Sequence, residues 1–85
     1  MNVRDKNVRD KVIDILSSYR NSKEIYELLE KDTLTPLALN SIEFVRFTVD
    51  LEAEFEIIWY DEDLDFGKFE SFSFLFNYVE DQLYE

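Results

Sequence analysis

Apolar residues recur at helical spacing in two long stretches of the chain. Between residues 8 and 19, and again between residues 72 and 83, they return every three or four positions, which places them on one face of a helix. The serine-rich run 17–22 predicts the end of the first helix, and Ser71 is suited to cap the last. Residues 23–31 carry a weaker helical signal. The two apolar faces comprise Val8, Val12, Ile15, Leu16 and Tyr19, and Phe72, Leu75, Phe76, Val79 and Leu83.

Residues 42–56 fit two patterns. Apolar and acidic residues alternate over residues 49–57, which is the period of a strand, but a helical stripe also begins at Phe44. Leu, Glu and Ala favour a helix, and no turn signal interrupts the segment. We therefore expect a helix that begins after Asn40 as N-cap, with Glu43 completing a capping box.

The remaining segments predict connections and one domain spanning residues 1–85. Pro36 predicts a loop over residues 32–37, and residues 57–70 form an acidic, aromatic connector. The sequence Asn-Val-Arg-Asp-Lys occurs twice at the N-terminus, with a period that suits neither helix nor strand. We expect the first copy, residues 1–6, to be a frayed extension. The elements together predict a small all-α bundle.

Composition and charge exclude several classes of function. The chain has no Cys and no His, which excludes a disulfide scaffold, a thiol nucleophile, an ordinary zinc site and imidazole chemistry. Residues 1–39 hold seven basic and seven acidic residues, so residues 40–85 carry the whole net charge of −11. Such a half repels nucleic acid and anionic membranes. It either attracts basic protein surfaces or serves only as a solubilising surface. No apolar run approaches the roughly 18 residues of a membrane span, and we expect a soluble, cytoplasmic protein.

The sequence disfavours a calcium site and carboxylate catalysis. Asp61, Asp63 and Asp65 match the first positions of a calcium loop, but Phe66 stands where that loop needs glycine and Phe72 where it needs glutamate. The abundant carboxylates fall on polar faces, where none is shielded enough for acid–base catalysis. The single glycine leaves no phosphate-cradling loop. We expect neither a metal site nor an enzyme.

Ser41 is the remaining candidate. A serine at a helix start is most simply an N-cap, but the surrounding run Leu-Ala-Leu-Asn-Ser-Ile, residues 37–42, is more specific. In this setting the chain resembles the acyl and peptidyl carrier proteins, whose attachment motif reads Leu-Gly-x-Asp-Ser-Leu. Residues 51–57 resemble the end of that family's second helix, residues 61–64 the start of its third and residues 71–80 its last. The ordered match spans residues 8–84.

The resemblance implies a four-helix bundle of the acyl carrier protein type, with three long helices and a short third helix. It implies a discrete acyl carrier protein, which is not an enzyme. A phosphopantetheinyl transferase would attach 4′-phosphopantetheine from coenzyme A to Ser41, and its thiol would hold acyl groups as thioesters, supplying the sulfur that the chain lacks. A loading ligase and downstream synthases would be the other partners, and the carrier is expected to be a monomer.

The resemblance also implies a partner-facing surface, and the chain departs from the family there. Ala38 replaces the motif glycine, and if the loop needs a positive φ it costs about 1 kcal/mol. Asn40 replaces the motif aspartate and Arg46 an acid, which favours a specialised polyketide, nonribosomal peptide or lipid pathway. A free-standing peptidyl or aminoacyl carrier and an unmodified, carrier-like interaction module remain alternatives. The implied recognition residues are Asn40, Ile42, Glu43, Arg46, Val49, Asp61 and Glu62.

The aromatic residues bear on the cargo. Carriers of fatty chains open a cavity between their second and third helices. Phe47, Trp59 and Phe69 are expected near that region, and such large rings are typical of a core. We therefore expect them to fill the space and to leave the cargo mostly outside the bundle.

Overall fold

A computed structural model describes residues 3–84, and every regular element in that range is helical. Four α-helices and three single-turn 3-10 helices are present, with no strand among the described residues. The prediction of a small all-helical bundle with four helices is confirmed at this level. The α-helices are α1 (Val3–Leu16), α2 (Ser22–Lys31), α3 (Ser41–Phe55) and α4 (Phe72–Tyr84), and the 3-10 turns are η1 (Thr35–Leu37), η2 (Asp61–Asp63) and η3 (Phe66–Lys68).

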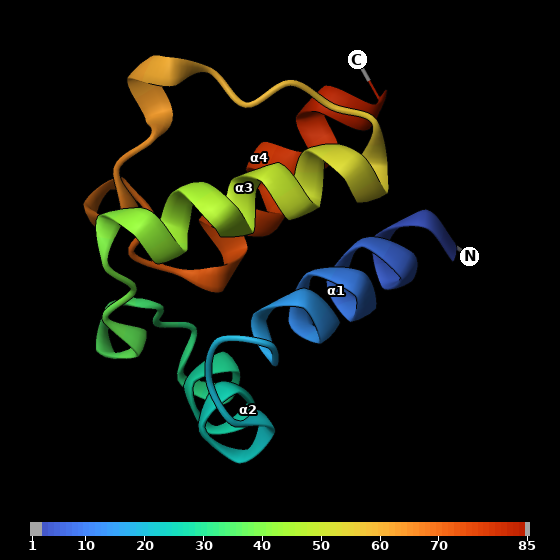
Figure 1. Ribbon diagram of the computed structural model, residues 1–85. Helices are drawn as coiled ribbons and strands as arrows, with labels where there is room; N and C mark the ends of the chain where they lie inside the picture. The colour runs from blue at the N-terminus through green and yellow to red at the C-terminus, as the bar shows by residue number, and fades with distance from the viewer. Residues whose placement is uncertain (1–2, 85) are drawn as a thin grey trace.

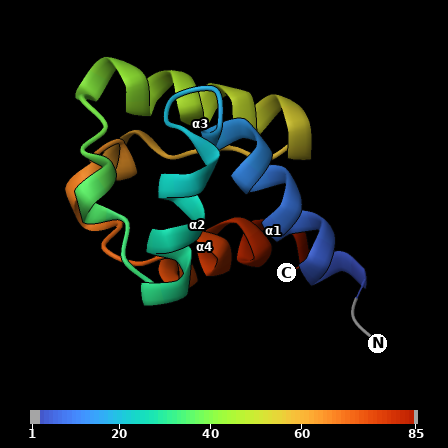
Figure 2. The same ribbon diagram turned by 90° about the horizontal axis from the view of Figure 1, so that it is seen from below.

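Helix α1 packs against both α3 and α4. Figure 2 shows α3 and α4 on opposite sides of the molecule, with α1 and α2 between them. Because the apolar faces of all four helices point inward, they form one continuous core. From α1 that core takes Val8, Val12, Ile13 and Leu16; from α2, Ile25; from α3, Phe44, Phe47 and Leu51; and from α4, Phe72, Leu75, Phe76 and Val79.

The first helix ends where the sequence predicts and begins earlier. Its last residue is Leu16, directly before the serine-rich run. The expectation that residues 1–6 form a frayed extension is wrong for residues 3–6, which belong to α1, while Met1 and Asn2 lie outside the described residues. No proline or glycine occurs in residues 3–16, so nothing in the sequence stops the helix from extending toward the N-terminus.

The short third helix implied for the segment after α3 is not an α-helix. Turns η2 and η3 occupy that segment. The four α-helices are reached because α2, a short helix before α3, adds to the three longer ones. In an α-helix the Asp63 carbonyl would accept a hydrogen bond from the Gly67 amide. Here that carbonyl accepts from the Trp59 indole N–H at 2.9 Å, and the Gly67 amide donates to the Asp65 carboxylate at 2.9 Å. These two bonds replace the helical ladder.

Five rings from α3, the connector and α4 pack together as an aromatic cluster. Neighbouring ring centroids lie 4.4 to 5.9 Å apart, the range in which aromatic pairs add to burial. The connector runs back along α3 toward its N-terminal end, as Figures 1 and 2 both show. The prediction that Phe47, Trp59 and Phe69 belong to the core is confirmed. The aromatic cluster consists of Phe44, Trp59, Phe66, Phe69 and Tyr78.

Within residues 3–84, none of the helices has the length and apolar character needed to cross a membrane.

Candidate functional site

Helix α3 begins with the predicted capping box. The Asn40 side chain accepts a hydrogen bond from the Glu43 amide at 2.8 Å, and the Glu43 carboxylate accepts one from the Asn40 amide at 3.0 Å. The backbone at Asn40 is extended, with φ −77° and ψ 173°, as an N-cap requires. Asn40 is therefore the cap, and the simple interpretation of Ser41 as N-cap is wrong.

Ser41 is the first residue of α3, and its side chain is exposed. Its hydroxyl makes no hydrogen bond with any residue between 3 and 84. The free amides of the first helical turn and the helix dipole favour a negatively charged group at this position. No described base contacts the hydroxyl, so Ser41 can be a group that another enzyme modifies but has no partner to activate it.

The loop before Ser41 contains left-handed backbone. Ala38 has φ 52° and ψ 47°, a conformation that costs about 1 kcal/mol for a residue with a Cβ. The buried side chains of Leu37 and Leu39 fix the loop on either side of it. The positive φ at residue 38, considered from the sequence as a condition of the family's loop, is thus present. The left-handed backbone falls on an alanine, where the motif that the sequence resembles has glycine.

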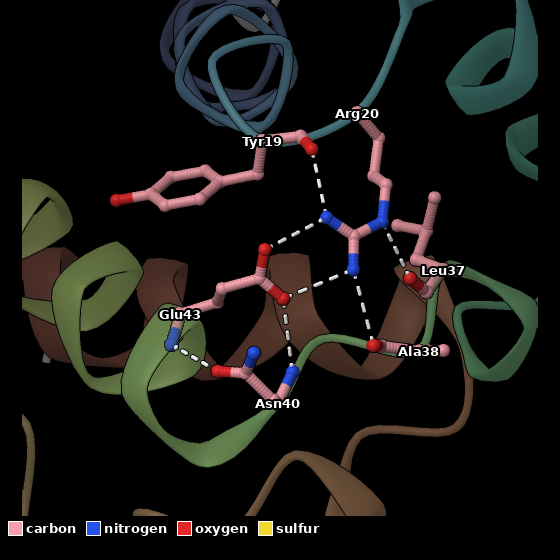
Figure 3. A network of polar contacts seen from close by, with 6 residues as sticks. All are labelled: Tyr19, Arg20, Leu37, Ala38, Asn40 and Glu43. Carbon is pink, nitrogen blue, oxygen red and sulfur yellow. Dashed lines mark hydrogen bonds and ion pairs between the residues drawn. The ribbon is translucent and has the colours of Figure 1, made fainter.

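Arg20 lies between α1 and α2, and its side chain binds the backbone of this loop. Its Nε donates to the Leu37 carbonyl at 2.8 Å, and Nη2 donates to the Ala38 carbonyl at 3.1 Å. Nη1 donates to the Tyr19 carbonyl at 2.7 Å. Two further bonds, of 2.9 and 3.0 Å, form a fork with the Glu43 carboxylate. Figure 3 shows all five bonds converging on one guanidinium group, so Arg20 ties the loop to the start of α3.

The same contacts change the acidity of Glu43. The fork from Arg20, and next the amide of Asn40, lower its pKa from 4.5 to about 2, because both stabilise the ionised form. Glu43 was predicted from the resemblance as a partner-recognition residue. Its carboxylate has an internal role in the described structure, and its contact with a partner stays a prediction.

The other predicted recognition residues are all exposed. Ile42 and Val49 lie on the outer face of α3 with 71% and 53% of their surface accessible, and Arg46 is exposed between them. Asp61 and Glu62 are exposed in η2, a turn that the connector brings toward the N-terminal end of α3 (Figure 1). Val45, which the resemblance did not single out for recognition, adds a third exposed apolar residue to the same helix.

Two of the three aspartates of the calcium pattern make internal hydrogen bonds, and the third, Asp61, is exposed. Asp63 accepts hydrogen bonds from the Tyr78 hydroxyl at 2.9 Å and from Lys68 at 3.4 Å, and Asp65 caps η3. Burial, followed by the bond to Asp63, raises the pKa of Tyr78 to about 12. Within the part of the chain that the structure describes, no three acidic side chains are placed to hold a metal ion.

Comparison with known proteins gives no match: no family model, no curated protein and no solved structure is significantly similar to the chain. Function is therefore inferred from the residues and their geometry.

Sequence reasoning missed Arg20, the residue with the most polar contacts near Ser41. It lies 23 positions before Glu43, so no periodic pattern links the two residues. The one available signal is that an arginine stands among small polar residues where a helix ends. Arginine carries a rigid set of donors, and such residues often bind backbone carbonyls and carboxylates.

Proposed function

We propose that the chain is a discrete acyl carrier protein that is modified on Ser41 with 4′-phosphopantetheine. The observation that carries the proposal is the geometry around that residue. Its hydroxyl is exposed and makes no hydrogen bond with the residues that the structure describes. Ser41 follows a left-handed turn and is the first residue of a 15-residue helix that begins with a capping box. This arrangement coincides with the serine and the glycine of the carrier motif that the sequence resembles.

The chemistry of attachment requires little from the chain. The Ser41 oxygen attacks the pantetheine-bearing phosphorus of coenzyme A, the bond to adenosine 3′,5′-bisphosphate breaks, and the hydroxyl proton passes to a base on the transferase. The amides and dipole at the start of α3 favour the resulting phosphodiester by about 0.3–1 kcal/mol. The attached arm supplies the thiol that carries acyl groups as thioesters. Ser41 holds the arm and has no catalytic role.

The exposed face of α3 suits partners that recognise the modified serine. Ile42, Val45 and Val49 recur along one side of the helix beginning next to Ser41, which gives a partner an apolar contact line. Asp61 and Glu62 add negative charge in η2, and residues 40–85 carry the net charge of −11. Transferases, ligases and synthases with basic surfaces would be drawn to this side by long-range attraction.

The packing of the aromatic cluster supports an external cargo. Phe44 and Phe69 are 1% exposed and Trp59 is 5% exposed, and their rings fill the space between α3, the connector and α4. An acyl chain that entered this region would have to displace well-packed rings, which is costly in a dense core. We expect a loaded acyl group to remain outside the bundle, and a structure with a long chain buried inside would contradict this.

Intact mass measurement after incubation with coenzyme A and a broad-specificity phosphopantetheinyl transferase tests the proposal. The chain contains a matched control, because Ser22 also follows an asparagine N-cap as the first residue of a helix. We expect one phosphopantetheinyl group on the wild type and on Ser22→Ala, and none on Ser41→Ala. Modification of Ser41→Ala to the same extent would contradict the proposal.

If the wild-type protein is not modified, the next variant to test combines Ala38→Gly with Asn40→Asp, which restores the family's motif. Modification of that variant on Ser41 would assign the silence to the choice of transferase. Continued silence of a folded variant would favour an unmodified interaction module. Loading the modified protein with fatty acids or amino acids would then separate an acyl carrier from an aminoacyl carrier.

A further inference from the structure

We propose that Arg20 is the positioning residue of the Ser41 site, holding the loop 37–40 in the conformation that presents the serine to its transferase. This inference rests on the proposed function for the second half of that statement. That Arg20 holds the loop in place does not depend on the proposed function, and a separate measurement tests it. Arg20 contacts the backbone before Ser41 and does not touch Ser41 itself.

The hydrogen-bond inventory of Arg20 is complete. A guanidinium has five N–H donors, and in Arg20 they meet three backbone carbonyls and both oxygens of Glu43. The side chains of Arg20 and Glu43 are 23% and 29% exposed, so the pair is partly shielded from water. No donor is left over to bind a substrate, and the contacts can act only through the loop and the helix start that they join.

The contacts fall where the loop is most strained. Ala38 occupies left-handed backbone without the freedom of glycine. Arg20 binds the carbonyl of Ala38 and that of the preceding Leu37, so a change in the torsion angles at residue 38 would break one or both bonds. The guanidinium charge also reinforces the capping box, because the Glu43 oxygen that accepts from the Asn40 amide accepts from Nη2 of Arg20 as well. Arg20 thus supplies through hydrogen bonds the local order that Ala38 cannot supply alone.

A lysine cannot replace these contacts. Its ammonium has three donors around one atom and lacks the planar fork that reaches two carbonyls and a carboxylate together. Without the fork, the loop would sample other conformations while the bundle stays folded. A transferase that binds only the ordered loop would then show a KM raised by the inverse of the ordered fraction, with an unchanged kcat.

The experiment compares Arg20→Lys and Arg20→Gln with Lys11→Gln, which removes another ion pair to α3, that between Lys11 and Glu54. The transferase reaction on each unmodified protein gives kcat and KM with coenzyme A in excess. Hydrogen exchange of the Ala38 and Asn40 amides gives the order of the loop without any enzyme. Circular dichroism identifies the conditions in which each variant is folded.

We expect both Arg20 variants to raise KM by about tenfold, with kcat unchanged, and to exchange the two amides about tenfold faster. Lys11→Gln should match the wild type in both measurements. Equal KM values and equal exchange rates in folded Arg20 variants would overturn the inference. Because Arg20→Gln can lower stability, Glu43→Gln provides a second variant that keeps a capping side chain but loses the charged fork, and it should give an intermediate change.

Failure of the proposed function gives a distinct result. If neither the wild-type protein nor the variant with Ala38→Gly and Asn40→Asp accepts phosphopantetheine, the kinetic measurement cannot be made and the carrier proposal fails. Hydrogen exchange of the Ala38 and Asn40 amides still tests the role of Arg20 in the loop. Faster exchange in the Arg20 variants supports that role, and unchanged exchange overturns it.

Discussion

Two helices of this chain begin with the same local sequence and differ in what precedes them. Helix α2 starts with Asn21 and Ser22, and α3 starts with Asn40 and Ser41. In both, the asparagine side chain accepts from the amide three residues later at 2.8 Å, and that residue is a glutamate. Only α3 has the reciprocal bond of a capping box and a left-handed turn before its N-cap. Only in α3 is the glutamate of the first turn paired with Arg20.

The electrostatic surroundings also differ. Ser22 lines a shallow hollow of about 170 Å³ together with Asp10 and Asp14, and carboxylates there repel a phosphate group. Ser41 stands beside a glutamate whose charge is matched by Arg20. The comparison teaches that a serine at a capped helix start is not a site by itself. What distinguishes Ser41 is the loop that leads to it and the residue that holds the loop.

Removing the apolar anchor behind each helix start should have the largest effect. Phe44 and Ile25 both lie four residues after the N-cap, at 1% and 0% exposure. We expect Phe44→Ala to lower the free energy of unfolding by about 3–5 kcal/mol and Ile25→Ala by about 2–5 kcal/mol, because each leaves a cavity. Urea unfolding measures both values. A loss below about 1 kcal/mol for Phe44→Ala would contradict its place at the centre of the aromatic cluster.

Replacing each N-cap residue should distinguish an effect on folding stability from an effect on the modification of Ser41. Asn40→Ala and Asn21→Ala should each lower the free energy of unfolding by about 1 kcal/mol, since each loses one capping bond. Only Asn40→Ala should also slow modification of Ser41, because only that cap belongs to the site. Thermal unfolding and transferase kinetics are the two measurements. Equal slowing by both variants would show that helix capping, and not the loop, controls the reaction.

Replacing the strained alanine should have a smaller effect of opposite sign. Ala38→Gly relieves left-handed strain of about 1 kcal/mol but adds entropy to the unfolded chain, so we expect a net stabilisation of up to about 0.5 kcal/mol. Glu56→Gly is the matched control, because Glu56 ends α3 with nearly the same backbone, at φ 55°. Urea unfolding of both variants tests this prediction, and marked destabilisation by Ala38→Gly would contradict it.

The smallest expected effect is the contribution of the Arg20–Glu43 pair to stability in acid, which a pH titration measures. Because the pKa of Glu43 falls from 4.5 to about 2 on folding, its ionised form favours the folded state. That stabilisation is complete above pH 4.5 and is lost as the pH falls toward 2. A carboxyl NMR titration of Glu43 should give a midpoint near 2, and Glu43→Gln should lack this part of the acid destabilisation. A midpoint near 4.5 would indicate that the fork does not persist in solution.

The sequence predicted the features that depend on neighbours along the chain. The stripe that begins at Phe44 and the cap at Asn40 are local, and both appear in α3 as expected. The connector was harder to predict, because the bond from the Trp59 indole to the Asp63 carbonyl depends on where the ring is buried. Arg20 was missed for the same reason: four of its five bonds go to Leu37, Ala38 and Glu43, which lie 17 to 23 positions further along the chain.

The measurement that tests the central claim most directly is made on the protein from the cells that produce it. Proteolysis into peptides and mass spectrometry would locate any phosphopantetheinyl group, with the Ser22 peptide as internal comparison. We predict the group on the peptide that contains Ser41 and an unmodified Ser22 peptide. A fully unmodified Ser41 peptide, or the group on any other residue, would contradict the assignment of Ser41 as the attachment site.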